Sequence, residues 1–278
     1  MKIMTLNTHS LQEKEMAKKQ RIVAEFIAAQ QPEIIALQEV NQTMANPVLE
    51  TLPPRYVAVQ DRVAMKSDNY ANALQNELIQ LGQTYYFAWL PMKVGYDKYD
   101  EGLAIFSKKP ILNTRTFRVS GDYDYTNYRI RMALGIQTED GWFFSTHMSW
   151  WNDPEEPFAG QWERLQEETA DLEQLFLMGD FNGDANVRNE TYDLIQSSGW
   201  HDTYTLAVTK DNGWTVSGTI DGWHDQEAVE HRRIDLIWSR QEVPVASSEV
   251  IFNGLNQPVV SDHFGLIVQY SNEVLPSL

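Results

Sequence analysis

The sequence Leu175-Phe-Leu-Met-Gly-Asp-Phe-Asn182 joins an apolar run to an acid and an amide. A short run of Leu, Phe and Met is typical of a buried strand. In an extended segment Asp180 and Asn182 point to one face, whereas Phe181 points to the opposite face and into the core. The segment therefore predicts a strand that ends by presenting two polar side chains together. A simple turn is the alternative, because the segment is rich in turn-forming residues.

Acidic, amide or histidine residues also stand at the ends of other apolar segments. These are Asn7 after residues 3–6, Glu39 after 34–37, His147 after 143–146, Asp235 within 233–238, and Asp262 with His263 before 264–268. In a sheet-based enzyme the ends of neighbouring strands meet at one edge, where ligand sites form. Such a set of oxygen donors predicts a divalent-cation site, with the histidines left for proton transfer or phosphate contact.

The flanking sequence predicts a mixed α/β chain. Residues 2–6 and 34–37 are expected to form buried strands joined by a helix over 14–30, which ends at Pro32. Further helices are expected over 69–81 and 159–174, and strands over 102–107, 129–137, 142–146, 175–178, 234–238 and 264–269, with more strand material at Tyr204. Neither a repeat nor a low-complexity linker divides the chain, so we expect residues 1–278 to form a single domain.

Composition and charge exclude several classes of protein. The chain of 278 residues has 22 Lys and Arg against 39 Asp and Glu, which gives a net charge of −17. With 42% hydrophobic and 22% charged residues it is typical of a globular protein. The absence of cysteine excludes disulfides and thiolate chemistry. There is no apolar run long enough for a transmembrane helix and no signal-peptide pattern, so we expect a cytoplasmic protein.

Seven motifs, taken in order, resemble those of the endonuclease/exonuclease/phosphatase superfamily. They are Leu6-Asn7-Thr8, Leu37-Gln38-Glu39-Val40, Asp100-Glu101-Gly102 with the strand to Ser107, Ser145-Thr146-His147, Gly179-Asp180-Phe181-Asn182, Arg233-Ile-Asp235 and Ser261-Asp262-His263. The resemblance implies an α/β fold, a four-layered α/β/β/α sandwich of two packed mixed sheets flanked by helices. It also implies hydrolysis of phosphoester bonds with Mg²⁺ or Mn²⁺, by in-line attack of a metal-activated water on phosphorus.

The same resemblance implies roles for the acids and amides. Glu39 would be the primary metal ligand, and Asn7 and Asp262 would assist it. Asp180 would act as the base for the attacking water, and Asn182 would hold a phosphoryl oxygen. The alternative for each is an ordinary structural role as a loop acid or a turn residue.

Histidines, arginines and one tyrosine complete the implied site. His263 would contact the phosphoryl group with its tautomer fixed by Asp235, and His147 would be oriented in the same way by Glu101. The other implied substrate contacts are Arg131, Arg129 on the same face, and Tyr99 in the substrate channel. Buried structural histidines, an ion pair and core packing are the respective alternatives.

Residues outside the motifs bear on the substrate. Three of the nine tryptophans, Trp150, Trp151 and Trp223, lie where they could form a platform for a sugar ring, with core packing as the alternative. The acidic charge disfavours a nuclease, which grips a backbone with Lys and Arg, without excluding one. It also disfavours a membrane-lipid substrate.

A narrower resemblance concerns the segments 6–10, 95–102, 149–151 and 218–223. They are similar to a bacterial branch of the superfamily that dephosphorylates maltose 6'-phosphate. We therefore expect a phosphomonoesterase that acts on a small phosphorylated sugar. The alternatives are a Mg²⁺-dependent nuclease, a hydrolase of lipid or inositol phosphates, and a phosphate-binding module without catalysis.

Overall fold

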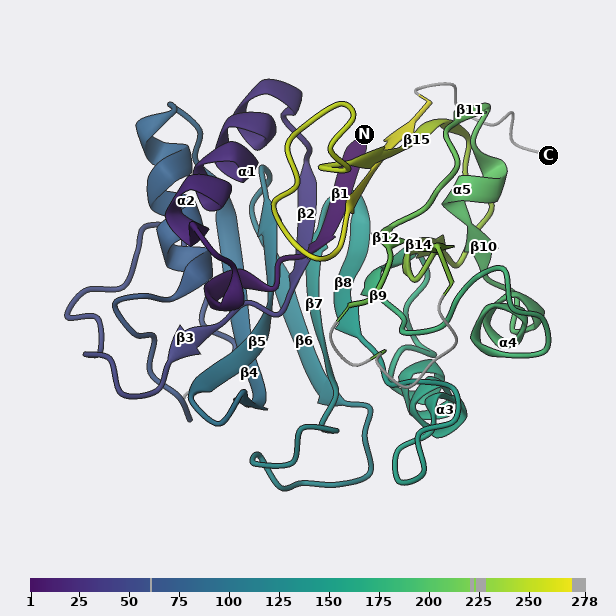
Figure 1. Ribbon diagram of the computed structural model, residues 1–278, viewed down its shortest axis with the longest axis horizontal. Helices are drawn as coiled ribbons and strands as arrows, with labels where there is room; N and C mark the ends of the chain where they lie inside the picture. The colour runs from purple at the N-terminus through teal and green to yellow at the C-terminus, as the bar shows by residue number, and fades with distance from the viewer. Residues whose placement is uncertain (61, 221–222, 224–228, 272–278) are drawn as a thin grey trace.

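The computed structural model describes residues 1–60, 62–220, 223 and 229–271. Two large β-sheets face one another, and helices lie on their outer faces (Figure 1). Residues 221 and 222 of the segment 218–223 lie outside the described residues.

The first sheet has eight strands. They are β1 (Lys2–Asn7), β2 (Ile34–Gln38), β3 (Gln42–Thr43), β4 (Tyr86–Gly95), β5 (Tyr99–Ser107), β11 (Thr209–Lys210), β15 (Val245–Ile251) and β16 (Gly265–Tyr270), in the order β11-β15-β16-β1-β2-β5-β3, with β4 also paired to β5. Strands β1 and β2 are parallel and are joined by helix α1 (Met16–Gln30), which confirms the predicted strand-helix-strand unit. Their register places Asn7 beside Gln38, the residue before Glu39.

The second sheet has six strands. They are β6 (Asn113–Arg118), β7 (Met132–Thr138), β8 (Gly141–His147), β9 (Leu175–Asp180), β10 (His201–Asp202) and β14 (Asp235–Ser239), in the order β10-β14-β9-β8-β7-β6. Strands β8 and β9 are parallel and are connected through helix α3 (Phe158–Glu168). A small ribbon of β12 (Val216–Ser217) and β13 (His231–Arg232) lies outside both sheets.

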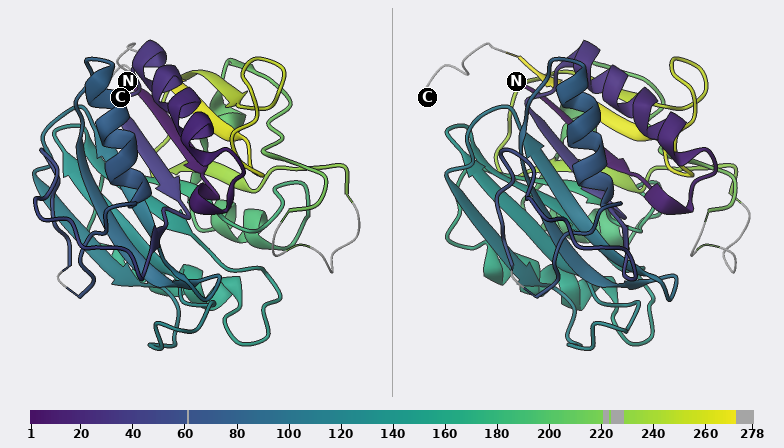
Figure 2. Two further views of the ribbon diagram at one scale, coloured as in Figure 1. Left: turned by 60° about the vertical axis from the view of Figure 1, so that its left-hand side comes forward. Right: turned by 90° about the vertical axis from the view of Figure 1, so that its left-hand side faces the viewer.

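The helices and the buried side chains define the layers. Helices α1 and α2 (Tyr70–Gln80) cover the outer face of the first sheet, and α3 and α4 (Thr191–Ser197) cover that of the second (Figures 1 and 2). The core between the sheets contains side chains such as Ile105, Leu134 and Phe143. The expected four-layered sandwich is therefore confirmed. No helix in the described ranges is both long and apolar enough to cross a bilayer.

The ends of the elements follow local chemistry. The Asn69 side chain accepts a hydrogen bond from the backbone N of Asn72 at 3.1 Å and caps α2, as expected for Asn at a helix start. Tyr204 lies in the short helix α5 (Thr203–Leu206) and not in a strand, because Asp202 caps that turn by accepting from Tyr204 N. The remaining short helix is η1 (Ser10–Gln12).

Candidate active site

Three neighbouring strands of the second sheet bring His147, Asp180 and Asp235 to one position. In the register of β8, β9 and β14, His147 lies opposite Asp180, and Asp180 lies opposite Asp235. Residues directly opposite one another in a sheet point to the same face. All three side chains are buried, so three titratable groups lie side by side with little exposure to solvent.

His263 reaches this row from the loop before β16. Its Nδ1 lies 2.9 Å from Asp235 Oδ2, so the expected contact between these residues is present. Its Nε2 lies 3.8 Å from Asp180 Oδ2, and His147 Nε2 lies 3.6 Å from the same oxygen. Two imidazoles thus converge on one carboxylate, an arrangement suited to proton transfer.

The two histidines differ in charge. Burial lowers the pKa of His263, but the hydrogen bond and the charge of Asp235 outweigh it, so its pKa lies well above the usual 6.5. Burial also lowers the pKa of His147, and the nearby charge of Arg131 lowers it further, well below 6.5. At neutral pH His263 is therefore protonated and His147 is neutral.

Glu39 directly follows the C-terminal end of β2 in the first sheet, next to the row formed by His147, Asp180 and Asp235. Its backbone has a φ of 52°, a conformation that non-glycine residues adopt at some cost in energy and often at functional sites. Asn7 Nδ2 donates to Glu39 Oε1 at 2.9 Å and to Asp180 Oδ2 at 3.2 Å, so one amide connects both acids. Glu39 Oε2 is buried and has no hydrogen-bond partner in the described part of the chain.

These acids fit a divalent cation. Burial, reinforced by the charge of Glu101, raises the pKa of Glu39 to about 7. Burial also raises the pKa of Asp180 to about 6, with the charge of Asp235 acting in the same direction. A buried carboxylate oxygen without a partner is costly unless a positive charge meets it, and carboxylate and amide oxygens are the ligands that Mg²⁺ prefers. The carboxylates of Glu39 and Asp180 therefore suit Mg²⁺ or a similar ion, whereas Asn7 faces both acids with its amide nitrogen and its Oδ1 accepts from the backbone N of His9 at 3.2 Å.

Asp262 lies further out. Its Oδ1 is 3.7 Å from His9 Nδ1, and His9 also pairs with Glu13 at 2.8 Å. His9, Glu13 and Asp262 are all half-buried, and each offers a ligand atom within 4.8 Å of the others. Asp262 thus adds negative charge near Glu39 from the rim of the site.

Two buried cations lie among these acids. Lys93 in β4 is 6% exposed, and Arg131, just before β7, is 1% exposed. Lys93 Nζ and Arg131 Nη1 both donate to the backbone carbonyl of Tyr128 at 2.9 Å. Lys93 Nζ also lies 3.1 Å from Glu101 Oε1. Arg131 Nε is buried and has no hydrogen-bond partner among the described residues, so its N–H is an unused donor.

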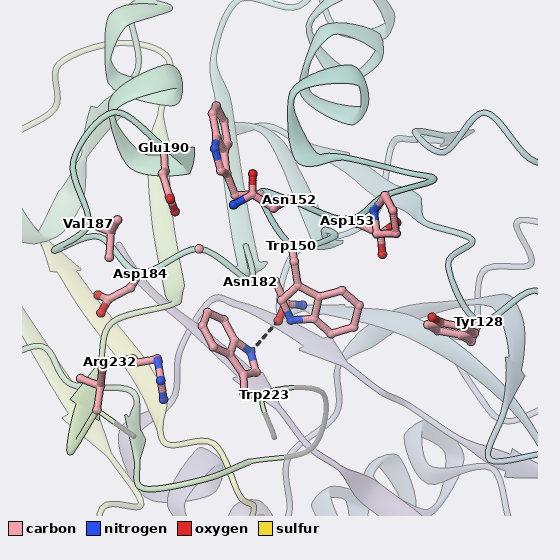
Figure 3. A pocket seen from close by; sticks show the side chains of 14 residues that line it. Tyr128, Trp150, Asn152, Asp153, Asn182, Asp184, Val187, Glu190, Trp223 and Arg232 are labelled. Carbon is pink, nitrogen blue, oxygen red and sulfur yellow. Dashed lines mark hydrogen bonds between the residues drawn. The ribbon is translucent and has the colours of Figure 1, made fainter. Parts of the chain in front are cut away.

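Two adjoining cavities open over the site. The smaller, of about 370 Å³, is lined by residues that include Glu39, Lys93, Arg131, His147, Asp180 and His263. The larger, of about 650 Å³, is lined by residues that include Trp150, Trp151, Asp184, Glu190, Trp223 and Arg232. Tyr128, Trp150 and Asn182 line both cavities. Figure 3 shows the larger cavity, with Glu190, Asp184 and Arg232 at one side of the view and Tyr128 and Asp153 at the other.

The expected contacts of Glu101, Arg129 and Tyr99 differ in the structure. Glu101 forms an ion pair with Lys93 and not with His147, and neither Glu101 Oε1 nor His147 Nδ1 has a hydrogen-bond partner in the described chain. Arg129 lines neither cavity, because its guanidinium pairs with Asp153 at 3.1 Å and with Glu155 at 3.2 Å.

Tyr99 also lies away from both cavities. Its side chain is buried, and its hydroxyl donates to the carbonyl of Leu11 at 3.2 Å. Tyr96, in the turn between β4 and β5, lines the smaller cavity in its place. Sequence reasoning also missed Lys93 and Tyr128, because a strand lysine is usually a surface residue and a lone loop tyrosine has no distinctive signal.

Gly179 explains how Asp180 reaches its position. Its φ is 148°, and a Cβ added there would lie 2.0 Å from the carbonyl oxygen of Thr146 in the neighbouring strand. We expect Gly179→Ala to lower the free energy of unfolding by about 3 kcal/mol, since neither strand backbone can yield. Gly199→Ala is the matched control, because Gly199 has a φ of 86° with no atom within 4 Å, and we expect a loss of about 1 kcal/mol. Urea unfolding measures both, and equal losses would contradict the prediction.

A sequence model described as the Endonuclease/Exonuclease/phosphatase family matches residues 4–263. A search of curated proteins found no match. The solved structure of an endonuclease/exonuclease/phosphatase family protein from Leptotrichia buccalis is similar at 33% identity, with a TM-score of 0.84 over 98% of this chain and 99% of that chain.

Two more distant structures share the fold. A mannosyl-6-phosphatase from Bacteroides thetaiotaomicron is 17% identical, with a TM-score of 0.61 over 98% of this chain and 99% of that chain. A 3' phosphatase from Neisseria, bound to a product DNA hairpin, is 16% identical, with a TM-score of 0.62 over 98% and 99% of the two chains.

Proposed function

Because the chain belongs to the endonuclease/exonuclease/phosphatase family, whose members are metal-dependent phosphoester hydrolases, we propose that it is a phosphomonoesterase acting on a phosphorylated sugar. Maltose 6'-phosphate is the model substrate that we propose. We also propose a cytoplasmic location, because sugars that are phosphorylated during uptake would reach the enzyme there.

The burial of Lys93 and Arg131 in the smaller cavity is the observation that carries the monoester part of this proposal. A phosphate monoester has a second ionisation near pH 6 and carries nearly two negative charges at pH 7, whereas a diester carries one. Protonated His263 adds a third positive group to the same cavity. Glu39, Glu101 and Asp180 line the same cavity, and a divalent ion there would offset much of their charge, so the three cationic groups would then favour the dianion over the monoanion.

The side chains divide the work of an in-line displacement. Asp180 accepts a proton from the attacking water. The oxygen of that water forms a bond to phosphorus while the bond between phosphorus and the sugar oxygen breaks. Asn182 and Arg131 hold phosphoryl oxygens and do not react. His263 is protonated and gives its proton to the departing sugar oxygen. His147 is neutral and donates a hydrogen bond to the phosphoryl group.

A divalent ion, Mg²⁺ or Mn²⁺, would be held by Glu39 with Asp180 and Asp262 as further oxygen donors, and when bound it would supply positive charge that polarises the phosphoryl group. Asn7 would orient the Glu39 and Asp180 carboxylates through its amide nitrogen. Asp235 acts through His263, because their 2.9 Å contact fixes which nitrogen faces the cavity.

The larger cavity supports a sugar as the leaving group. Its wall combines the indole rings of Trp150, Trp151 and Trp223 with polar groups, a combination that stacks on sugar C–H faces and bonds to hydroxyls. Asp184 and Glu190 also line it, and their charges would repel a second phosphate placed there. A neutral, hydroxylated leaving group therefore fits better than a nucleic-acid strand.

A nuclease or DNA phosphatase is the second candidate, because the Neisseria structure with the same fold binds a DNA hairpin. The test incubates the protein and Mg²⁺ with a panel of sugar phosphates and, separately, with supercoiled plasmid. We expect inorganic phosphate from the sugars, intact plasmid, and loss of activity in EDTA. Plasmid nicking without phosphate release from sugars would instead favour the nuclease.

Lys93→Met tests the preference for monoesters. The change removes one buried positive charge at nearly constant volume, so we expect kcat/KM for a sugar phosphate to fall about 30-fold, and that for bis(p-nitrophenyl) phosphate to fall less than about threefold. Lys98→Met, at an exposed lysine nearby, should change neither value. Equal losses of kcat/KM for the monoester and the diester would show that Lys93 does not interact with the second negative charge of the phosphate.

A further inference from the structure

Trp223 connects the larger cavity to the phosphate site through one hydrogen bond. Its Nε1 donates to Asn182 Oδ1 at 3.0 Å, as the dashed line in Figure 3 shows. Trp223 lines the larger cavity, whereas Asn182 lines both cavities. Trp223 is 9% exposed and Asn182 is 5% exposed, so little water competes for this bond.

The hydrogen bonds of Asn182 fix the direction of its side-chain amide. Nδ2 donates to the carbonyl oxygen of Met148 at 2.9 Å, while Oδ1 accepts from the indole of Trp223. An indole N–H can only donate, and a carbonyl oxygen can only accept. Reversing the amide would set Nδ2 against the indole N–H and Oδ1 against the Met148 carbonyl, and both bonds would be lost. The amide therefore has one orientation.

This orientation determines what Asn182 can hold. Its second Nδ2 hydrogen has no partner among the described residues, so it remains available as a donor. An ionised phosphoryl oxygen accepts hydrogen bonds and cannot donate them, so only the nitrogen end of the amide can bind it. The backbone N of Asn182 also donates to Asp180 Oδ1 at 2.9 Å, which anchors the residue beside the proposed base.

We propose that Trp223 is a positioning residue for the reaction and a wall of the leaving-group subsite at once. Its N–H holds Asn182 with the amide nitrogen available to the phosphoryl group, and its ring contacts a neutral sugar that fills the larger cavity. The Arg232 guanidinium lies 4.6 Å from the ring centroid and Ile220 packs in the same cluster, so the indole is held in place. This inference rests on the proposed phosphomonoesterase function.

Two substitutions separate the two roles. Trp223→Phe keeps an aromatic wall and removes the N–H. Trp223→His keeps a five-membered ring with an N–H at the equivalent position and removes the six-membered ring. Each variant is assayed with maltose 6'-phosphate and with methyl phosphate, whose leaving group is too small to fill the larger cavity.

The two variants should fail in different ways. We expect Trp223→Phe to lower kcat about tenfold on both substrates, with KM changed less than about twofold, because only phosphoryl alignment is lost. We expect Trp223→His to keep kcat within about threefold and to raise KM about tenfold for maltose 6'-phosphate alone, because only sugar contact is lost. Trp142→Phe, at the end of β8 distant from His147, should change neither constant.

A double variant tests whether Trp223 acts through Asn182. In the Asn182→Ala background, Trp223→Phe should lower kcat no further, since residues that act as a unit are not additive. Full kcat in Trp223→Phe, or losses that multiply in the double variant, would overturn the inference. If Trp223→Phe does not fold, Trp223→His decides alone, and a large kcat loss on methyl phosphate would reject it. Wild-type protein that releases no phosphate from either ester would instead reject the proposed function.

Discussion

Glu39→Gln is expected to lower kcat/KM for phosphate release by about a thousandfold or more, even at saturating Mg²⁺. The substitution removes the negative charge of the carboxylate whose Oε2 is buried without a partner, while the amide keeps the size of the side chain. Glu50→Gln, at an exposed acid, is the matched control and should retain full activity. A Glu39→Gln enzyme within tenfold of the wild type would remove Glu39 from the metal site.

The same variant has a second readout in stability. The pKa of Glu39 is raised to about 7 in the native protein, from 4.5 in the unfolded chain. Between these values the native state binds more protons than the unfolded state, so this group lowers stability as pH rises from about 4.5 through about 7. In EDTA at pH 8, Glu39→Gln should therefore melt at a higher temperature than the wild type, and the difference should shrink at pH 5. Added Mg²⁺ should raise the melting temperature of the wild type alone.

Asp180→Asn is expected to have the other large effect, a fall in kcat of about a thousandfold or more. Asp180 Oδ2 is the oxygen approached by both His147 and His263, and it accepts from the Asn7 amide, so the substitution removes the proposed base and the charge at the centre of the site. Because KM reports mainly on the phosphate and sugar contacts, it should change far less than kcat.

Asp184→Asn provides the control for Asp180→Asn. Asp184 follows in the same loop and lines the larger cavity, where its loss should alter KM for a sugar phosphate more than kcat. Steady-state kinetics over a range of pH measures both variants. A kcat that is retained in Asp180→Asn, with activity still lost in EDTA, would show that another group activates the water.

Much of the fold was predictable because short apolar runs that end in polar residues can be recognised in the local sequence. The parallel strands β1 and β2 and the capped helix α2 follow from apolar runs, Pro32 and Asn69. Strand β4 was not predicted, since Pro91 and Lys93 interrupt any alternation of apolar and polar residues. Its position depends on pairing with β5, a contact that no short window of sequence contains.

The site was predictable where residues lie next to one another in a strand register, and less so where partners come from loops. His147, Asp180 and Asp235 meet because three strands align them. Arg129 was expected at the phosphate, but the loop before α3 supplies Asp153 within 3.1 Å of its guanidinium. The burial of Lys93 depends on the carbonyl of Tyr128, distant in sequence, and is visible only in the folded chain.

Comparison of two phosphate monoesters tests the central claim most directly. Initial rates of phosphate release with Mg²⁺ are measured for maltose 6'-phosphate and for a single-stranded oligonucleotide with a 3' phosphate, at equal concentrations below KM. The charges of Asp184 and Glu190 and the indole rings of the larger cavity predict a kcat/KM at least about a hundredfold higher for the sugar phosphate. An equal or higher value for the oligonucleotide, lost in Glu39→Gln, would contradict the sugar assignment while leaving the metal-dependent hydrolase in place.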